Sequence, residues 1–234
     1  MDLEKLSSPG LKDLFVQRLQ GMILSGELLV GSKLPPERTL AEQMRISRTV
    51  VNSGLAELAE QGFLEVRPRQ GTYVADHRRQ GNLDTLAAIT RYQGGVLERE
   101  DIRSVLEVRR SMEHLAADRA IRYASDEALE RLAVPLARIA AAATDEEAAL
   151  AAFTFRHELA LVGGNTILPL LFHSFKDPLI ALWTRYCGRF GNLAIVRNTE
   201  TLYSFLKKRD TDGAVCWINA YLERVISGSQ QVYE

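Results

Sequence analysis

Residues 34–74 decide the fold of the first part of the chain; they read LPPERTLAEQMRISRTVVNSGLAELAEQGFLEVRPRQGTYV. A short helix is expected over 37–44, because Pro36 suits the first turn of a helix and the apolar residues that follow share one face. Ser47 is a good N-cap for a second helix, and Gly62 fits the position just past its end. Two helices joined by a tight turn are therefore predicted.

A hairpin is expected directly after the second helix. Residues 64–67 and 72–74 alternate as strands do, and Pro68–Gly71 between them suits a hairpin tip. Before residue 34, a longer helix is indicated by apolar residues at helical spacing: Leu11, Leu14, Phe15, Leu19, Met22 and Ile23. The expected order of helix, short helix, helix and hairpin is that of a winged helix-turn-helix.

The bulk properties of the chain are those of an ordinary globular protein. It has 234 residues, of which 46% are hydrophobic and 25% charged, with a net charge of −1. No apolar run approaches the roughly 20 residues that span a bilayer, and the first ten residues lack the apolar core of a secretory signal. The two cysteines have no zinc-type spacing. We therefore expect a cytoplasmic protein that does not bind membranes.

The sequence predicts a mostly α protein in three parts. Residues 1–77 form the winged helix-turn-helix, 78–98 a linker with a short helix, and 99–234 an all-α bundle of six or seven helices. The helices expected in the bundle cover 100–123, 126–143, 145–163, 167–188, 191–208 and 211–228.

The second helix of such a module is the one that reads DNA in the major groove. Its first residues here are Ser47, Arg48 and Thr49. Arg48 can contact guanine O6 and N7 with two hydrogen bonds, and the hydroxyl groups of Ser47 and Thr49 suit phosphates. On the preceding helix, Arg38 is placed to reach a phosphate.

The wing offers a second set of candidates. Arg67, Arg69 and Gly71 surround the hairpin tip, where contacts to the minor groove or the DNA backbone are expected. The alternative for any one of these arginines is a solvated surface without a partner, but their joint placement at helix start, turn and wing favours double-stranded DNA as the partner.

Four blocks of this region closely resemble the GntR family signature, which includes LPSERxLA, VSRxxV and a GxGTxV wing. The blocks are residues 34–41, 46–51, 62–64 and 71–74. There are three departures. Asn52 stands where the family usually has a DNA-contacting arginine, Ser53-Gly54 replaces Glu-Ala, and Arg45 replaces a glycine. Since Asn can read adenine, Asn52 remains a candidate DNA contact, and the operator is expected to differ from the usual family site.

The second part resembles the helical domain of the FadR-like GntR subfamily. The likeness lies in residues 105–113, VLEVRRSME, and residues 155–165, FRHELALVGGN. The resemblance implies a helical bundle with a central ligand pocket and a homodimer.

Most members of that subfamily hold a divalent metal through one Asp and three His. Here those positions correspond to Ala152, Arg156, Thr199 and Tyr221, none of which is a good metal ligand. The neighbouring His157 is displaced by one residue, which turns its side chain about 100° away on a helix. We therefore expect no metal and no other cofactor.

The residues at and near these positions favour an anionic ligand. Arg156 stands at a metal-ligand position, and Arg109 matches a family position that faces the ligand. Two arginines suit a carboxylate, a phosphate or another anionic ligand. Residues 182–185 and 155–156 also resemble the metal-free branch of the subfamily, which implies an acyl-CoA as a further candidate. Thr199 belongs to the same predicted site, and Trp217 and Tyr221, one turn apart, could line its apolar part. Alternatively, the two arginines form structural ion pairs with Glu107, Glu113 or Glu158.

The combined pattern favours a transcription regulator that binds an operator as a homodimer, responds to an anionic small molecule and acts as a repressor. An enzyme is the first alternative, but the chain has no P-loop, no HExxH and no Ser/His/Asp or Cys/His arrangement. The second alternative is a DNA-binding dimer with a purely structural helical domain that needs no ligand.

Overall fold

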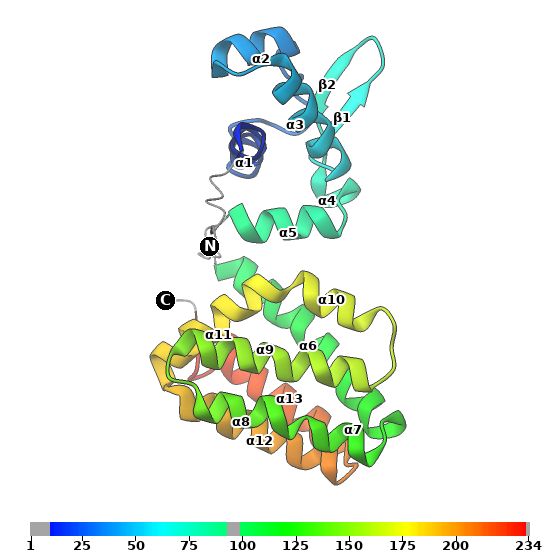
Figure 1. Ribbon diagram of the computed structural model, residues 1–234, viewed down its shortest axis with the longest axis vertical. Coiled ribbons are helices and arrows are strands. Elements are labelled where there is room, and N and C mark those ends of the chain that lie inside the picture. Colours follow the sequence, from blue (N-terminus) through cyan, green and yellow to red (C-terminus); the bar gives the residue numbers. More distant parts are fainter. Residues whose placement is uncertain (1–9, 93–98, 233–234) are drawn as a thin grey trace, which may run out of the picture. The chain divides into compact units, whose positions relative to one another are not determined.

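The computed structural model describes residues 10–92 and 99–232, and the chain divides into two compact units, Met1–Gly94 and Gly95–Glu234 (Figure 1). The polar arm before Gly10 and the Gly94-Gly95 pair lie outside the described residues. Within those ranges, no helix is both long and apolar enough to cross a membrane. The predicted class, a winged helix-turn-helix followed by an all-α domain, is confirmed.

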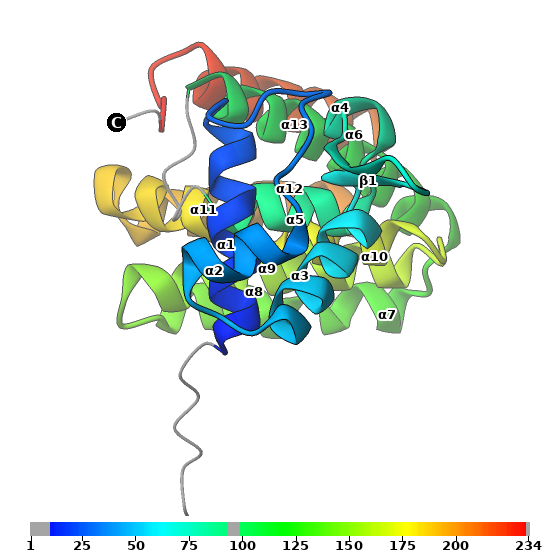
Figure 2. The same cartoon turned by 90° about the horizontal axis from the view of Figure 1, so that it is seen from above.

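The first unit contains the expected elements in the expected order, together with one short helix, α4 (His77–Gln80), that the sequence did not predict. They are α1 (Leu11–Leu24), α2 (Glu37–Met44), α3 (Arg48–Glu60), β1 (Leu64–Arg67), β2 (Gly71–Val74), α4 (His77–Gln80) and α5 (Leu83–Tyr92). Helix α1 runs beside α3, and α2 packs on α3 (Figure 2). The core of this unit lies mainly between α1 and α3, where Phe15, Leu19, Val51 and Leu58 are all buried.

The ends of α3 form as their residues predict. The Ser47 hydroxyl oxygen accepts a hydrogen bond from the Val50 N–H at 3.2 Å, which caps the first turn. At the other end Gly62 has a φ of 75°, the left-handed conformation that favours glycine just past a helix. Both termini of the predicted reading helix are thus set by local sequence.

The wing is a two-stranded antiparallel sheet with a short third segment beside it. The register pairs Leu64 with Val74 and Arg67 with Gly71. On the other side of β2, Lys33 pairs with Tyr73, and the Leu34 N–H donates to the Thr72 carbonyl at 2.8 Å. This extra pairing places Lys33 next to the wing.

The short helix α5 packs on the first unit. Ala88 is buried in the same core as α1 and α3. At the start of α5, the Asn82 side-chain amide donates to the Glu60 carbonyl at 2.9 Å, and the buried Thr85 hydroxyl donates to the Gln61 carbonyl. The start of α5 therefore caps the C-terminal end of α3.

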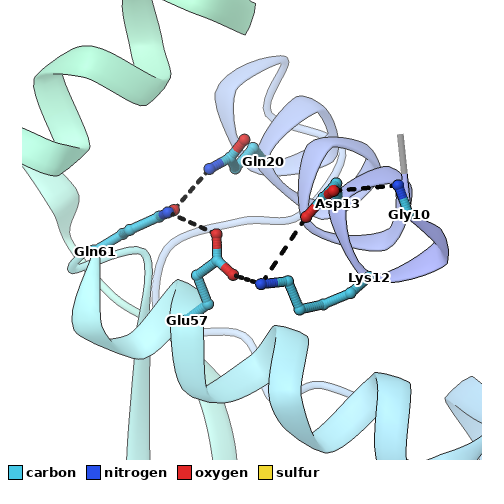
Figure 3. Close-up of polar contacts among 6 residues, drawn as sticks. All are labelled: Gly10, Lys12, Asp13, Gln20, Glu57 and Gln61. Atoms are coloured by element: carbon cyan, nitrogen blue, oxygen red, sulfur yellow. Dashed lines mark hydrogen bonds and ion pairs between the residues drawn. The ribbon is translucent and has the colours of Figure 1, made fainter. Parts of the chain in front are cut away.

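A polar network joins α1 to the same end of α3 (Figure 3). Lys12 lies 2.8 Å from a Glu57 carboxylate oxygen. Gln20 donates to the Gln61 side chain at 2.7 Å, and Gln61 donates to Glu57 at 3.2 Å. The orientation of α3 is therefore held by side chains from α1 as well as by its apolar face.

The second unit is entirely helical in its described residues. Its elements are α6 (Arg99–Tyr123), α7 (Asp126–Arg131), α8 (Ala133–Ala141), α9 (Asp145–Val162), α10 (Leu168–Ser174), α11 (Lys176–Phe190), α12 (Asn192–Lys207) and α13 (Thr211–Ile226). Helix α9 packs against α6, α8, α10, α11 and α12, so it lies at the centre of this unit (Figure 1).

Two helices that were expected to be continuous are each divided. The expected helix over 126–143 breaks at Leu132, and that over 167–188 breaks at Phe175. A proline follows each break by three residues, at Pro135 and Pro178. Proline has no N–H to donate to the carbonyl four residues before it, and this interrupts the helix.

Candidate nucleic-acid interface and buried arginine cluster

A cationic groove lies between the start of α2, the start of α3 and the wing tip. It has a volume of about 450 Å³ and is lined by four cationic side chains and one acidic one: Lys33, Arg38, Arg48, Arg69 and Glu37. The groove therefore carries local positive charge on a chain whose net charge is −1. A phosphate backbone is the complementary ligand for such a surface.

The cations of the groove differ in how they are paired. Arg38 Nε lies 2.8 Å from Glu42 Oε1, one turn further along α2, and both side chains are exposed. Arg48 and Arg69 form no ion pair with any residue in the described part of the chain, and both are exposed. Arg48 and Arg69 can therefore meet a phosphate or a base without breaking an existing ion pair.

The first turns of α3 present their polar face to solvent. Arg48, Thr49 and Asn52 are exposed, whereas Val51 is fully buried against the core. Ser47 is exposed too, but its oxygen already caps the helix, so its predicted role toward DNA is limited to donating its O–H. The structure thus places the predicted reading residues together on one open surface.

The backbone at the wing tip is in unusual conformations. Arg69 has a φ of 64° and Gly71 a φ of 119°. The φ of Gly71 favours glycine there, whereas the Lys33 side-chain end that lies 2.8 Å from an added Cβ atom is flexible and can move aside. Gly71 thus shapes the backbone of the wing tip, and its role in DNA binding stays a prediction.

Arg67 differs from the other candidates because it is engaged with its own sheet. Its guanidinium lies 2.8 Å from Glu65 Oε2 and 4.3 Å from the centre of the Tyr73 ring. It does not line the groove. Lys33, which does, was missed by sequence reasoning, since only its pairing with β2 brings it beside Gly71.

Three charged side chains are buried together in the second unit. Arg109 and Glu113 come from α6 and Arg156 from α9, and each is at most 2% exposed. Arg109 Nε lies 2.6 Å from Glu113 Oε1, and Arg156 Nε lies 3.6 Å from the same oxygen. The ion-pair interpretation of these arginines is thus correct for Glu113, although a single carboxylate faces both cations.

Aromatic and polar side chains surround the three charges. The Trp183 ring lies 4.4 Å from Arg109 Cζ and 5.2 Å from Arg156 Cζ, and the Tyr221 ring lies 5.5 Å from Arg109 Cζ. Arg156 Nη1 donates to the Thr199 hydroxyl at 2.7 Å. The structure therefore brings together four of the five predicted ligand residues, with Trp183 as an additional member.

Trp217, the fifth predicted ligand residue, lies outside the cluster and contacts it through Tyr221. It stacks on Tyr221 with ring centres 6.4 Å apart, and its indole N–H donates to the Asn198 carbonyl at 3.3 Å. Asn198 in turn donates to the Tyr186 hydroxyl at 3.0 Å. Trp217 therefore supports the position of Tyr221 and makes no described contact with either buried arginine.

Burial and neighbouring charges shift the pKa values of the three cluster residues in different directions. Burial opposes the charge of Arg109, but Glu113 and Tyr221 together outweigh burial and raise the pKa of Arg109. For Arg156 burial is the stronger influence, and it lowers the pKa despite Glu113. Burial would raise the pKa of Glu113, yet the two arginines hold it below its usual value. Arg156 is thus the less compensated cation.

The residues at the family's metal positions do not fit a metal ion. They are Ala152, Arg156, Thr199 and Tyr221, and the guanidinium of Arg156 would repel a divalent cation. His157 packs instead against the Phe153 ring, 5.7 Å away. Among the described residues, no three His, Cys, Asp or Glu side chains are grouped closely enough to hold a metal.

Comparison with known proteins identifies both units. Residues 12–74 match the model of bacterial regulatory proteins of the gntR family, and residues 104–224 match that of the FCD domain. LutR, an HTH-type transcriptional regulator of Bacillus subtilis, is 28% identical over 188 residues, which cover 80% of this chain and 78% of LutR. The regulator Mce2R of Mycobacterium tuberculosis is 34% identical over 109 residues, covering 47% of this chain and 45% of Mce2R.

A solved structure supports the fold independently. The structure of Lar, which controls the expression of the Listeria monocytogenes agr system, has a TM-score of 0.66 to this chain at 14% identity. The match covers 95% of this chain and 98% of that one. The relatives are named as transcriptional regulators, so the prediction of a regulator and not an enzyme is confirmed. The chain belongs to the GntR family, in the subfamily with an FCD domain, and is a DNA-binding transcription regulator.

Proposed function

We propose that this regulator binds its operator as a homodimer and represses transcription until an anionic small molecule binds in the FCD domain. The observation that carries the ligand proposal is the buried cluster, in which two guanidinium groups share one carboxylate. Repression is the simplest mode of action, because a dimer over a promoter blocks polymerase by occupancy alone. A ligand that binds the two conformations with different affinities shifts their populations.

The proposed roles of the three parts of the chain follow the boundaries that the sequence predicts. We assign DNA binding to residues 1–77, the link to 78–98, whose helix α5 packs on the first unit, and ligand sensing and dimerisation to 99–234. Two copies would place two α3 helices in successive major grooves of a pseudo-palindromic operator. Arg48 and Asn52 would read base edges, while Arg38, Arg69 and the wing would contact phosphates.

Replacing Arg48 tests the DNA-reading part of this proposal. DNA selected from a random library with the wild-type protein provides the operator. Arg48→Ala should lower operator affinity by about tenfold or more, because a bidentate Arg–guanine contact contributes about 1–3 kcal/mol. Arg18→Ala, which removes an exposed arginine on α1 away from the groove, is the matched control. An operator affinity that is the same in both variants would contradict the assignment.

A thermal-shift screen tests the ligand. Small carboxylates and acyl-CoAs should include a compound that raises the melting temperature by binding only the folded protein. Arg156→Ala should weaken that effect without changing operator affinity in the absence of ligand. Loss of operator binding on adding the compound, and recovery of transcription in vitro, are the expected functional results.

A ligand-independent dimer is the competing function, and Glu113 is the observation that favours it. Because Glu113 contacts both arginines, the cluster could be structural only. Failure of every anion to stabilise the wild-type protein would support this alternative. Elemental analysis is a separate check, since a stoichiometric divalent metal in the FCD domain would contradict the proposed metal-free site.

A further inference from the structure

A groove on the second unit lies between α7, α8 and α9. It has a volume of about 570 Å³. Helices α8 and α9 pack against each other and are joined by residues 142–144, so they form an antiparallel helical hairpin (Figure 1). The buried Leu132 and Pro135 line the groove, together with Val134 and Leu161, which are 57% and 46% exposed. Exposed apolar side chains that gather in one groove favour a partner that covers them.

The groove also carries charges of both signs. Arg131, Arg138 and Glu158 line it, and all three side chains are exposed. None of them forms an ion pair with another residue in the described part of the chain. Thr154 lines the groove as well, but its hydroxyl already donates to the Leu150 carbonyl of its own helix at 2.9 Å. The three charges are therefore what a partner has to match.

The exposed apolar residues of α6 have different surroundings. Val108 and Leu115 are each 43% exposed. Two ion pairs flank them in the sequence, and both lie within α6: Arg103–Glu107 at 2.9 Å and Asp118–Arg122 at 2.6 Å. The groove between α8 and α9 differs because its charges have no such partners in the chain.

A second copy of this chain matches a surface of this composition. In a two-fold symmetric contact each patch meets itself, so its charges can be paired only if the patch contains both cations and anions. A strongly acidic partner, by contrast, would be repelled by Glu158. Exposed charge pairs add little affinity, but they fix the orientation in which apolar surfaces pack.

We propose that the groove between α8 and α9 is the face through which two copies of this chain dimerise. This rests on the proposed function, in which the second unit dimerises. A two-fold axis parallel to the groove places α8 of one copy over α9 of the other. Arg131 and Arg138 of each copy then face the partner's Glu158, and the apolar side chains between them form a bundle of four helices.

Replacing the apolar residues tests this interface. Sedimentation velocity with fluorescence detection measures the dimer dissociation constant of the full-length protein. Val134→Ser combined with Leu161→Ser should raise that constant by about tenfold or more, because apolar area that the partner covers is lost. Val108→Ser combined with Leu115→Ser is the matched control on α6 and should leave the constant unchanged.

Exchanging the charges tests whether two copies face each other there. One variant carries Arg131→Glu and Arg138→Glu, and a second carries Glu158→Arg. Each variant alone places like charges opposite each other and should dimerise about tenfold more weakly than the wild type, or less. Lys207→Glu combined with Lys208→Glu makes the same charge change as the first variant at exposed positions outside the groove, and should dimerise normally.

A mixture of the two charge variants is the decisive sample. In a mixed dimer the glutamates of one copy face the arginine of the other, and the second set of contacts is that of the wild type. Energy transfer between differently labelled copies should therefore show mixed dimers as tight as those of the wild type. Mixing cannot restore an ion pair within one chain, so recovery requires contact between copies.

The outcomes separate this inference from the proposed function. If the wild type is a monomer at every concentration, the proposed homodimer fails and this inference with it. If the wild type dimerises but the serine variant dimerises as tightly, or if mixing does not restore the dimer, only the assignment of this face is overturned. Should the serine variant not fold, the charge variants still decide, since they replace exposed side chains only.

Discussion

At the scale of single residues, Gly54 shows why this chain departs from its family's usual Glu-Ala in α3. A Cβ atom added at Gly54 would lie 2.4 Å from Cδ1 of the buried Phe15 ring in α1. The missing side chain is therefore what allows Phe15 to pack directly on the backbone of α3.

Gly54→Ala should destabilise the first unit, although alanine favours helix by about 1 kcal/mol relative to glycine. Overpacking against Phe15 costs about 1–3 kcal/mol, so we expect a lower urea midpoint. Ser53→Ala, at the exposed neighbouring position, should be neutral or slightly stabilising. A midpoint for Gly54→Ala at or above that of the wild type would show that Phe15 does not constrain this position.

Arg45 is a second departure from the family pattern, and it affects the backbone at the end of α2. It ends α2 with a φ of 54° and a ψ of 43°, where the family has glycine. A residue with a side chain is strained in this left-handed conformation by about 1–2 kcal/mol.

Arg45→Gly should therefore stabilise the protein, by up to about 1 kcal/mol after the greater freedom of glycine in the unfolded chain is subtracted. Arg45→Ala is the control, because it removes the same side chain and keeps the strained backbone. Equal midpoints for the two variants in urea denaturation would refute the strain explanation.

At the scale of elements, the contact between α5 and α3 holds the C-terminal end of α3, the helix that is proposed to read DNA. Thr85 is 2% exposed, and its hydroxyl donates to the Gln61 carbonyl just past the end of α3. Together with Asn82 it holds the end of α3 opposite to the residues that face DNA. The segment that follows the wing thus contacts the helix that is proposed to read the operator.

Thr85→Val should destabilise the first unit by about 1–3 kcal/mol, because the shape is kept while the partly buried Gln61 carbonyl loses its donor. We also expect faster amide hydrogen exchange in the last turn of α3. Asp84→Ala, at an exposed position next to Thr85, serves as the control. Unchanged exchange at the end of α3 would mean that this contact does not hold the helix.

At the scale of the whole molecule, charge is distributed unevenly. The chain has a net charge of −1, yet four cationic side chains line one groove of the first unit. Operator binding should therefore depend strongly on salt, because each phosphate contact releases counterions.

Arg69→Ala should weaken binding to selected and random DNA alike and reduce the slope of log K against log salt. The expected reduction is about 2 for a dimer, since each lost phosphate contact contributes about 0.9. Arg18→Ala should leave the slope unchanged. If Arg69→Ala lowered affinity for the operator only, Arg69 would be a base contact and not a phosphate contact.

Sequence patterns predicted what depends on near neighbours. The cap at Ser47, the left-handed Gly62 and the hairpin all follow from residues within a few positions of each other. The breaks at Leu132 and Phe175 also had a local signal, the prolines at 135 and 178. Continuous helices were nevertheless predicted, because the flanking residues have helical periodicity.

The sequence by itself therefore determined the winged helix-turn-helix, the all-α class of the second unit and the family, because caps, turns and periodicity act over one or two helical turns. Only the tertiary structure decided that Lys33 lies beside Gly71, and that Arg156 of α9 and Trp183 of α11 join the Arg109–Glu113 pair of α6. The physical reason is that these groups come from segments far apart in the chain. Their contacts depend on how helices pack, and local sequence does not encode which buried charges will meet.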